Sequence, residues 1–313
     1  MTNGRIIIDG RDITAYYGAY ITDQGLNALL SWPSSKKVDT VSWAESDYLD
    51  ADLSDLKLAA LEAVVTFGMS GYPTDVTAFV SWLSESIYRT WNVLSLRRTF
   101  RVRYVGVSSL SASDTLQSFA VSVAIDTPLD GYDYVAPVSQ IGSVNEYAID
   151  GVQLSDYGVR ILLGTLDSTA RPGRVKGLLK RDISTVDGVL YDEGGTNRKE
   201  TYDITLRCAM IDTTEEGLWR NYDALLYDLI RKDRTAAIDT DMCKRAIYSR
   251  RLDRTFECYY KSQTVRSFLP DGGRIWLLFD MTLGMVGDMA APAYLATEAG
   301  AWVNTENSYK ILI

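Results

Sequence analysis

The sequence predicts an α+β protein built mainly of antiparallel β-structure, in which the second half of the chain repeats the first. The opening stretch "IIIDGRDITAYYGAYI" recurs in its frame as "YAIDGVQLSDYGVRIL", beginning at Tyr147. Segments of alternating apolar residues then follow in the same order in both halves, and each half has one segment of helical period. We therefore expect each half to be an antiparallel sheet with one flanking helix.

The second strand of each half shows the clearest alternation. "LEAVVTFGM" (61–69) and "YDITLRCAM" (202–210) both alternate apolar and other residues, and they align at an offset of 141 residues. A period of two is typical of a strand with one buried face.

One helix follows this strand in each half. Its apolar stripe in the first half is Val76, Phe79, Val80, Leu83 and Ile87. The stripe in the second half is Leu218, Tyr222, Leu225, Leu226 and Leu229. Thr213 and Glu216 have capping-box spacing, which predicts the start of the second helix.

Two more strands complete each half. "RTFRVRY" (98–104) aligns with "RTFECYY" (254–260), and "FAVSVAI" (119–125) with "IWLLFDM" (275–281), both at an offset of 156 residues. The predicted domains are residues 1–140, residues 141–287 and a C-terminal arm, 288–313. One helix cannot cover both faces of such a sheet, so we expect a face or an edge to be covered by another copy.

Composition narrows the possible functions. Apolar residues make up 46% of the chain and charged residues 23%, the formal net charge is −9, and histidine is absent. Net acidity argues against a protein that grips nucleic acid, but not against a surface that DNA passes without binding. The commonest general base and the commonest transition-metal ligand are missing.

Targeting and redox signals are weak. The N-terminal apolar run is too short for a signal peptide, and no later run could cross a bilayer, so we expect cytosolic synthesis without membrane anchoring. The cysteines, Cys208, Cys243 and Cys258, show no CxxC spacing and are expected to be buried, reduced thiols.

Several short motifs could suggest chemistry. Asp47, Asp50, Asp52 and Asp55 share one loop, but this loop lacks the glycine and the closing glutamate of an EF-type calcium site. "GMSGY" around Ser70 does not complete a nucleophile elbow, and "EGGTNRKE" lacks the frame of a phosphate loop. A glycosidase-like carboxylate pair is not excluded, although no spacing singles one out. We expect no enzyme, catalytic residue, cofactor or metal.

The order of these elements resembles the tail-tube-like domain of distal tail proteins and other ring proteins of bacteriophage tails. The resemblance rests on the Ile-Asp-Gly strand, the Tyr-Gly turn, the long polar loop and the strand–helix–strand order, and it covers roughly residues 5–287. Trp32-Pro33 and Arg171-Pro172 occupy similar places in the two long loops. Many distal tail proteins carry a different, galectin-like C-terminal domain, whereas here the second half repeats the first.

The resemblance implies two tandem tube-like β-sandwich or barrel domains in a structural virion protein. Such a protein forms a ring around the tail channel, joins the tail tube to the baseplate or tail tip, and lets DNA pass. It would assemble in the bacterial cytoplasm as a hexamer, or as a trimer with pseudo-six-fold symmetry. Its partners would be the tail tube protein, the hub or tip and receptor-binding proteins. Two alternatives stay open: a tube or hub component of a contractile injection system, and a carbohydrate-binding or carbohydrate-cleaving tail-tip module.

Two sets of residues are candidates for these roles. The non-core positions of the second strands would face the channel, with an acidic bias that repels DNA; they include Glu62, Thr66, Asp203 and Thr205. The loops 31–56 and 170–199 are long and polar with scattered apolar residues, so we expect them to contact other chains. Their candidate inter-subunit residues are Trp32, Trp43, Arg171, Arg174, Lys176, Lys180 and Arg181.

Overall fold

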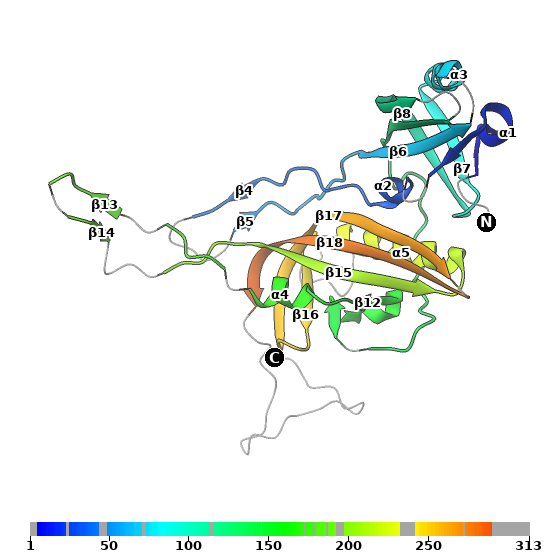
Figure 1. Cartoon of the computed structure of the whole chain (residues 1–313). Helices are drawn as coiled ribbons and strands as arrows, with labels where there is room; N and C mark the ends of the chain where they lie inside the picture. Colours follow the sequence, from blue (N-terminus) through cyan, green and yellow to red (C-terminus); the bar gives the residue numbers. More distant parts are fainter. Residues whose placement is uncertain are drawn as a thin grey trace.

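Two β-rich bodies and two narrow arms make up the chain in this computed structural model (Figure 1). The residues that the structure describes are 5–22, 25–43, 49–70, 73–112, 116–144, 146–171, 173–177, 180–185, 187–191, 197–231, 242–271 and 273–289. The predicted C-terminal arm, 288–313, falls almost entirely outside them, as does Asp47 of the acidic loop.

The first body is a seven-stranded antiparallel sheet with the strand order β2-β1-β7-β8-β9-β6-β3. Its strands are β1 (Ile6–Ile8), β2 (Arg11–Asp12), β3 (Ala19–Ile21), β6 (Leu61–Ser70), β7 (Tyr88–Val93), β8 (Arg98–Ala112) and β9 (Leu116–Ile125). Its helices are α1 (Ile13–Tyr17), α2 (Asn27–Leu30) and α3 (Pro73–Ser84). Helix α1 joins the edge strands β2 and β3, so the two edges lie one short helix apart and the sheet curls toward a barrel.

The second body is also a seven-stranded antiparallel sheet, with the order β11-β10-β16-β17-β18-β15-β12. Its strands are β10 (Tyr147–Ile149), β11 (Val152–Gln153), β12 (Val159–Ile161), β15 (Asp203–Asp212), β16 (Arg245–Ser249), β17 (Arg254–Asp271) and β18 (Arg274–Met289). Its helices are the 3-10 helix η1 (Leu154–Tyr157), α4 (Thr165–Ala170) and α5 (Glu215–Ile230). The predicted class, mostly antiparallel α+β, is confirmed; the domain limits 1–140 and 141–287 stay a prediction.

The shared Ile-Asp-Gly frame forms the same tight turn in both bodies. Asp9 and Gly10 join β1 to β2 with φ angles of 49° and 78°, and Asp150 and Gly151 join β10 to β11 with 49° and 82°. Two successive residues with positive φ are typical of a type I′ hairpin turn, which favours Asp-Gly because glycine has no Cβ to clash.

The second hairpin is longer than the sequence alignment predicted. Phe67 pairs with Phe119 in the first sheet, and its counterpart Cys208 pairs with Phe279 in the second. The equivalent residues of β9 and β18 therefore lie 160 positions apart, so the predicted offset of 156 was wrong for this strand. The difference lies in the turn, because Ala112 pairs with Gln117 whereas the corresponding Phe268 pairs with Leu277.

The two predicted helices exist, with small differences at their ends. The whole predicted stripe of α5 is buried, whereas Ile87 lies beyond the end of α3 with 73% of its surface exposed. The N-cap of α5 is Thr214 instead of Thr213, and its side chain accepts a hydrogen bond from the Gly217 amide at 3.1 Å. Strand β15 continues to Asp212, whose carboxylate accepts both threonine amides and moves the cap one residue on.

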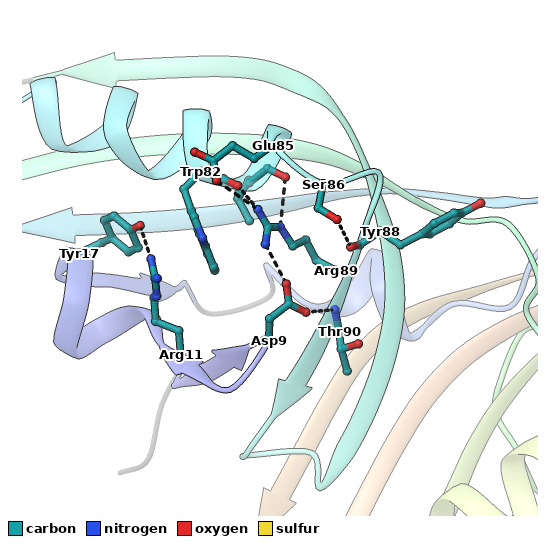
Figure 2. A network of polar contacts seen from close by, with 10 residues as sticks. Asp9, Arg11, Tyr17, Trp82, Glu85, Ser86, Tyr88, Arg89 and Thr90 are labelled. Atoms are coloured by element: carbon teal, nitrogen blue, oxygen red, sulfur yellow. Dashed lines mark hydrogen bonds and ion pairs between the residues drawn. The ribbon is translucent and has the colours of Figure 1, made fainter.

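In each body an aspartate–arginine pair joins the first hairpin to the adjacent strand and to the long helix. In the first body Asp9 accepts the Thr90 amide at 2.8 Å and pairs with Arg89 at 2.9 Å, while Arg89 also donates to the Trp82 carbonyl at the end of α3 (Figure 2). An arginine at a helix C-terminus is favourable because it satisfies carbonyls at the negative end of the helix dipole.

The second body repeats this arrangement. Asp150 accepts the Ala246 amide at 2.7 Å and lies 3.6 Å from Arg245, which donates to the Asp228 carbonyl of α5 at 2.8 Å. The pair is buried more deeply here, with side-chain exposures of 1% for Arg245 and 0% for Asp150. An aspartate and an arginine at equivalent positions therefore connect the first hairpin, the next strand of the sheet and the long helix in each body.

The two long loops form the arms, each of which carries a small hairpin. The first arm holds β4 (Thr40–Val41) paired with β5 (Asp50–Ala51), and the second holds β13 (Lys180–Asp182) paired with β14 (Val189–Tyr191). Figure 1 shows the first arm running across the β17–β18 end of the second body toward the second arm. The arms thus lie near each other although they leave different bodies.

Candidate assembly surfaces

Residues 27–35, which we call the covering segment, lie along the edge of β17. The Ser35 amide donates to the Lys261 carbonyl at 2.7 Å, and the Val265 amide donates to the Ser31 hydroxyl at 2.9 Å. The Asn27 side chain donates to the Arg266 carbonyl at 2.8 Å. Strand β16 pairs with β17 only as far as Cys258, so the covering segment satisfies backbone groups that would otherwise form an open edge.

Trp32 of the covering segment is enclosed by aromatic residues of the second body. Its ring centroid lies 4.5 Å from that of Tyr222, 6.0 Å from Tyr260 and 5.8 Å from Phe279, and 4% of the residue is exposed. The Tyr222 hydroxyl donates to the Leu30 carbonyl at 2.8 Å. Burial raises the pKa of both tyrosines, which keeps these hydroxyls protonated as donors. The expectation that Trp32 contacts another chain was wrong, because its partners lie in its own chain.

The returning strand of the first arm also packs on the second body. The Cys243 amide donates to the Leu53 carbonyl at 2.8 Å, and the Leu56 amide lies 3.5 Å from the Cys243 sulfur. Leu53 and Leu56 are buried. The base of loop 31–56 is therefore an intrachain contact, and only its outer part is left for other chains.

Helix α5 supplies a second contact between the bodies. Arg98 forms an ion pair with Asp223 at 2.7 Å and lies over the Trp219 ring at 5.0 Å. The Trp219 indole donates to the Leu96 carbonyl at 2.7 Å. Together with the covering segment, these contacts join the bodies through both apolar and ionic groups.

The outer part of the first arm meets the base of the second arm at one of the predicted residues. The Lys176 ammonium donates to the Trp43 carbonyl at 2.8 Å, and Lys176 is buried with 8% exposure. The Trp43 side chain is 58% exposed. Lys176 thus serves a contact within the chain, whereas the Trp43 ring stays open to a partner.

The remaining basic candidates of the second arm lie on its surface. Arg171, Arg174, Lys180 and Arg181 are all exposed. They share this surface with exposed apolar side chains of the same arm, namely Val175, Val189, Leu190 and Tyr191. Exposed apolar residues beside arginine and lysine are characteristic of a surface that a partner covers.

The two predicted channel-facing carboxylates, Asp203 and Glu62, are exposed on the sheets, and Asp203 forms an ion pair. Asp203 is exposed and bonds Lys261 at 2.8 Å and 3.0 Å. Glu62 is exposed beside Ala124, whose other neighbour Arg103 pairs with Asp126 at 2.7 Å and lowers the pKa of that carboxyl. Basic residues thus lie close to both carboxylates, and the channel-facing role of these positions stays a prediction.

The two predicted threonines of this face are half-buried. The Thr66 carbonyl accepts the Thr22 amide at 3.0 Å, and the Thr205 amide donates to the Ser168 hydroxyl at 2.7 Å. Thr22 follows the edge strand β3, and Ser168 follows the edge strand β12. The two threonines therefore lie near a sheet edge that the following segment of the chain covers.

The long strand β8 has an open edge in the first body. Strand β7 pairs only with residues 98–103 of β8, and beyond them β8 pairs with β9 on one side alone. Val105 is 54% exposed, Val107 41% and Leu110 54%. Within the described part of the chain, no backbone hydrogen bond satisfies the outer side of residues 105–110.

Sequence patterns did not reveal the covering segment, the Asp–Arg pairs or the open β8 edge. Each depends on residues that are far apart in the chain, and alternation does not report which strand edge is covered. The repeated Asp9/Asp150 frame was visible, but its partners Arg89 and Arg245 follow segments of unequal length.

In the part of the chain that the structure describes, no three His, Cys, Asp or Glu side chains are grouped so that they could hold a metal ion. Among the same residues, no helix is both long and apolar enough to cross a membrane. The cysteines are buried free thiols, as predicted.

The chain was compared with known families, curated proteins and solved structures. No family model matches the chain, and no curated protein matches it. The structure is similar to that of the Dit protein of phage SPP1, described as a paradigm of the hub adsorption apparatus in phages that infect Gram-positive bacteria. The similarity covers 90% of this chain and 97% of the Dit chain, at 13% identity and a TM-score of 0.30.

Proposed function

We propose that the chain is a structural protein of a bacteriophage tail that forms a ring around the tail channel. In this role it joins the tail tube to the baseplate or tip, and DNA passes through the ring without being bound. The proposal includes tandem tube-like domains at 1–140 and 141–287, with no catalytic step. Tail tube, hub and receptor-binding proteins would be its neighbours.

The observation that carries the proposal is the open edge of β8 beside a second sheet of the same strand order. A sheet with one open edge can be continued by the sheet of another copy, and repetition of that contact around an axis closes a ring without free edges. The exposed apolar and basic residues of β13–β14 support further contacts at the end of an arm.

Paired charges on the outward sheet faces also support passage of DNA. Lysine and arginine on these faces are engaged by aspartates, as in Lys261–Asp203 and Arg266–Asp280. A wall of such pairs offers few free cations to phosphates, so DNA would gain little counterion-release free energy by binding there.

Electron microscopy of the purified full-length protein tests the proposal. We expect two-dimensional class averages with a central hole, and a solution mass of three or six copies. A protein that stays monomeric or forms only dimers up to the highest soluble concentration would contradict the ring and would favour a carbohydrate-binding module.

A further inference from the structure

The bases of the two arms are equivalent at the level of single hydrogen bonds. In the first arm the Lys36 amide donates to Lys57 at 2.7 Å and the Ala59 amide to Ser34 at 2.8 Å, around the bridge Ser35–Leu58. In the second, residues 174, 176, 198 and 200 form the same two bonds at 2.7 Å and 2.6 Å around the bridge Val175–Lys199. Val175 is therefore the counterpart of Ser35.

The edges of β8 and β17 are equivalent too. Both strands have a bulge at the same place, between Tyr104 and Gly106 in β8 and between Tyr260 and Ser262 in β17. The bulged residues are Val105 and Lys261, and a bulge leaves its extra residue unpaired within the ladder. In β17 the carbonyl of that residue accepts the Ser35 amide.

Val175 is the counterpart of Ser35, and Val105 is the counterpart of Lys261. Unlike Ser35 and Lys261, these two residues do not bond to each other within the described chain. The amides on either side of Val175 bond toward residues 198–200, so the Val175 amide points away from that strand, as the Ser35 amide does. The Val175 amide makes no hydrogen bond in the described part of the chain, and the Val105 carbonyl accepts none there from outside its own sheet. Both side chains are exposed, Val175 at 53% and Val105 at 54%.

We propose that Val175 of one copy binds the bulged edge of β8 at Val105 of a second copy, as Ser35 binds β17 at Lys261 within the chain. The covering segment of the first arm would thus have an intermolecular counterpart at the base of the second arm. The contact joins different surfaces of two identical chains, so it repeats head to tail and can close into a ring. This inference rests on the proposed ring function and names the surface that forms it.

The residue types on the two edges agree with an intrachain contact at β17 and an intermolecular contact at β8. The covered edge of β17 presents Lys261 and Gln263, and Gln263 accepts the Trp32 amide at 2.7 Å. The corresponding positions of β8 are Val105 and Val107, which would meet the apolar Val175. Association of separate chains needs apolar burial to offset the loss of translational freedom, whereas a contact within one chain does not.

Disulfide trapping in the full-length protein tests the contact. The double variant Val105→Cys/Val175→Cys should form disulfide-linked dimers and higher species in non-reducing gels, because residues paired across a strand edge have a Cα separation of about 5 Å, within disulfide range. The native cysteines are all buried and should not contribute. Ser35→Cys/Lys261→Cys, which should close within the chain, checks the geometry at the equivalent intrachain position.

Two comparisons make the result decisive. Tyr16→Cys/Val175→Cys carries a thiol at an exposed position (68%) on helix α1, which packs on β1, β2, β3 and α3 and not along the open part of β8, and it should not cross-link. A mixture of the two single variants Val105→Cys and Val175→Cys should give dimers only, because each chain has one thiol on one of its two contact surfaces. Rings in the microscope without the 105–175 disulfide would overturn this contact and leave the proposed function standing. Absence of both rings and disulfide would overturn both.

Discussion

Trp32 leaves the first body at the start of an arm, and its aromatic neighbours Tyr222, Tyr260 and Phe279 belong to the second body. The side chain thus contributes to the core of a body whose aromatic residues at this site come 190 or more residues later in the chain. The position of a tryptophan beside a proline was visible in the sequence. Its burial was not, because a polar loop with scattered apolar residues fits an interface with another chain equally well.

Replacement of this tryptophan tests its role in stability. Trp32→Ala removes a buried ring from a packed aromatic cluster and should lower the free energy of unfolding by about 3–5 kcal/mol. The matched control Trp43→Ala removes a side chain that is 58% exposed and should change it by less than about 0.5 kcal/mol. Urea unfolding followed by circular dichroism measures both, and equal losses would show that Trp32 is not part of the second core.

At the scale of elements, alternation and helical period located the long strands and both long helices. They placed the ends of the strands less well. Strand β8 continues to Ala112 through "SSLSA", and β17 continues to Asp271, past bulges that reverse the alternation. Because a bulge adds one residue to one strand, a strict period of two fails beyond it.

The short elements had no readable signal. Helices α2 and α4 are 4 and 6 residues long, below the length at which an apolar period can be recognised. The Asp–Arg pairs could not be predicted from the sequence either. Asp9 and Arg89 are 80 residues apart, and only the folded sheet brings them to 2.9 Å.

The small hairpin β13–β14 lends itself to deletion. Every residue of both strands is exposed, so removal of residues 180–191 should leave the far-ultraviolet spectrum and the thermal midpoint of the protein unchanged. We expect assembly to weaken, as measured by light scattering, because Arg181 and the apolar side chains of β14 are lost. The substitution Lys180→Ala/Arg181→Ala separates the charges from the apolar residues. Full assembly after the deletion would exclude this hairpin from the interfaces.

At the scale of the whole molecule, the absence of histidine and the burial of tyrosines and cysteines determine the response to pH. Burial raises the pKa of Tyr132 to about 12, and it raises those of Tyr222, Cys208 and Cys258 as well. A raised pKa in the folded state means that the unfolded chain loses its protons first as the pH rises. Stability from these groups is therefore complete below their unfolded pKa values and decreases above them.

The expected result is a thermal midpoint that changes little between pH 6 and 8 and falls above about pH 9–10, where unfolded cysteines and tyrosines begin to ionise. The absorbance of tyrosinate, at about 295 nm, should rise in step with unfolding for the buried tyrosines. A titration that shows full tyrosine ionisation in the folded protein would contradict the burial of these side chains.

The covering segment also affects how contact formation depends on concentration. Residues 27–35 and their binding site on β17 belong to one chain, so the binding partner is present at a fixed effective concentration, in the millimolar range for a short tether. Dilution cannot separate them. In a ring made by the proposed contact, every second junction would be of this unimolecular kind, and only the others would depend on how many copies the cell contains. Joining the two sheets in one chain thus halves the number of encounters needed to complete a ring, and it ensures that the two kinds of sheet are present in equal numbers.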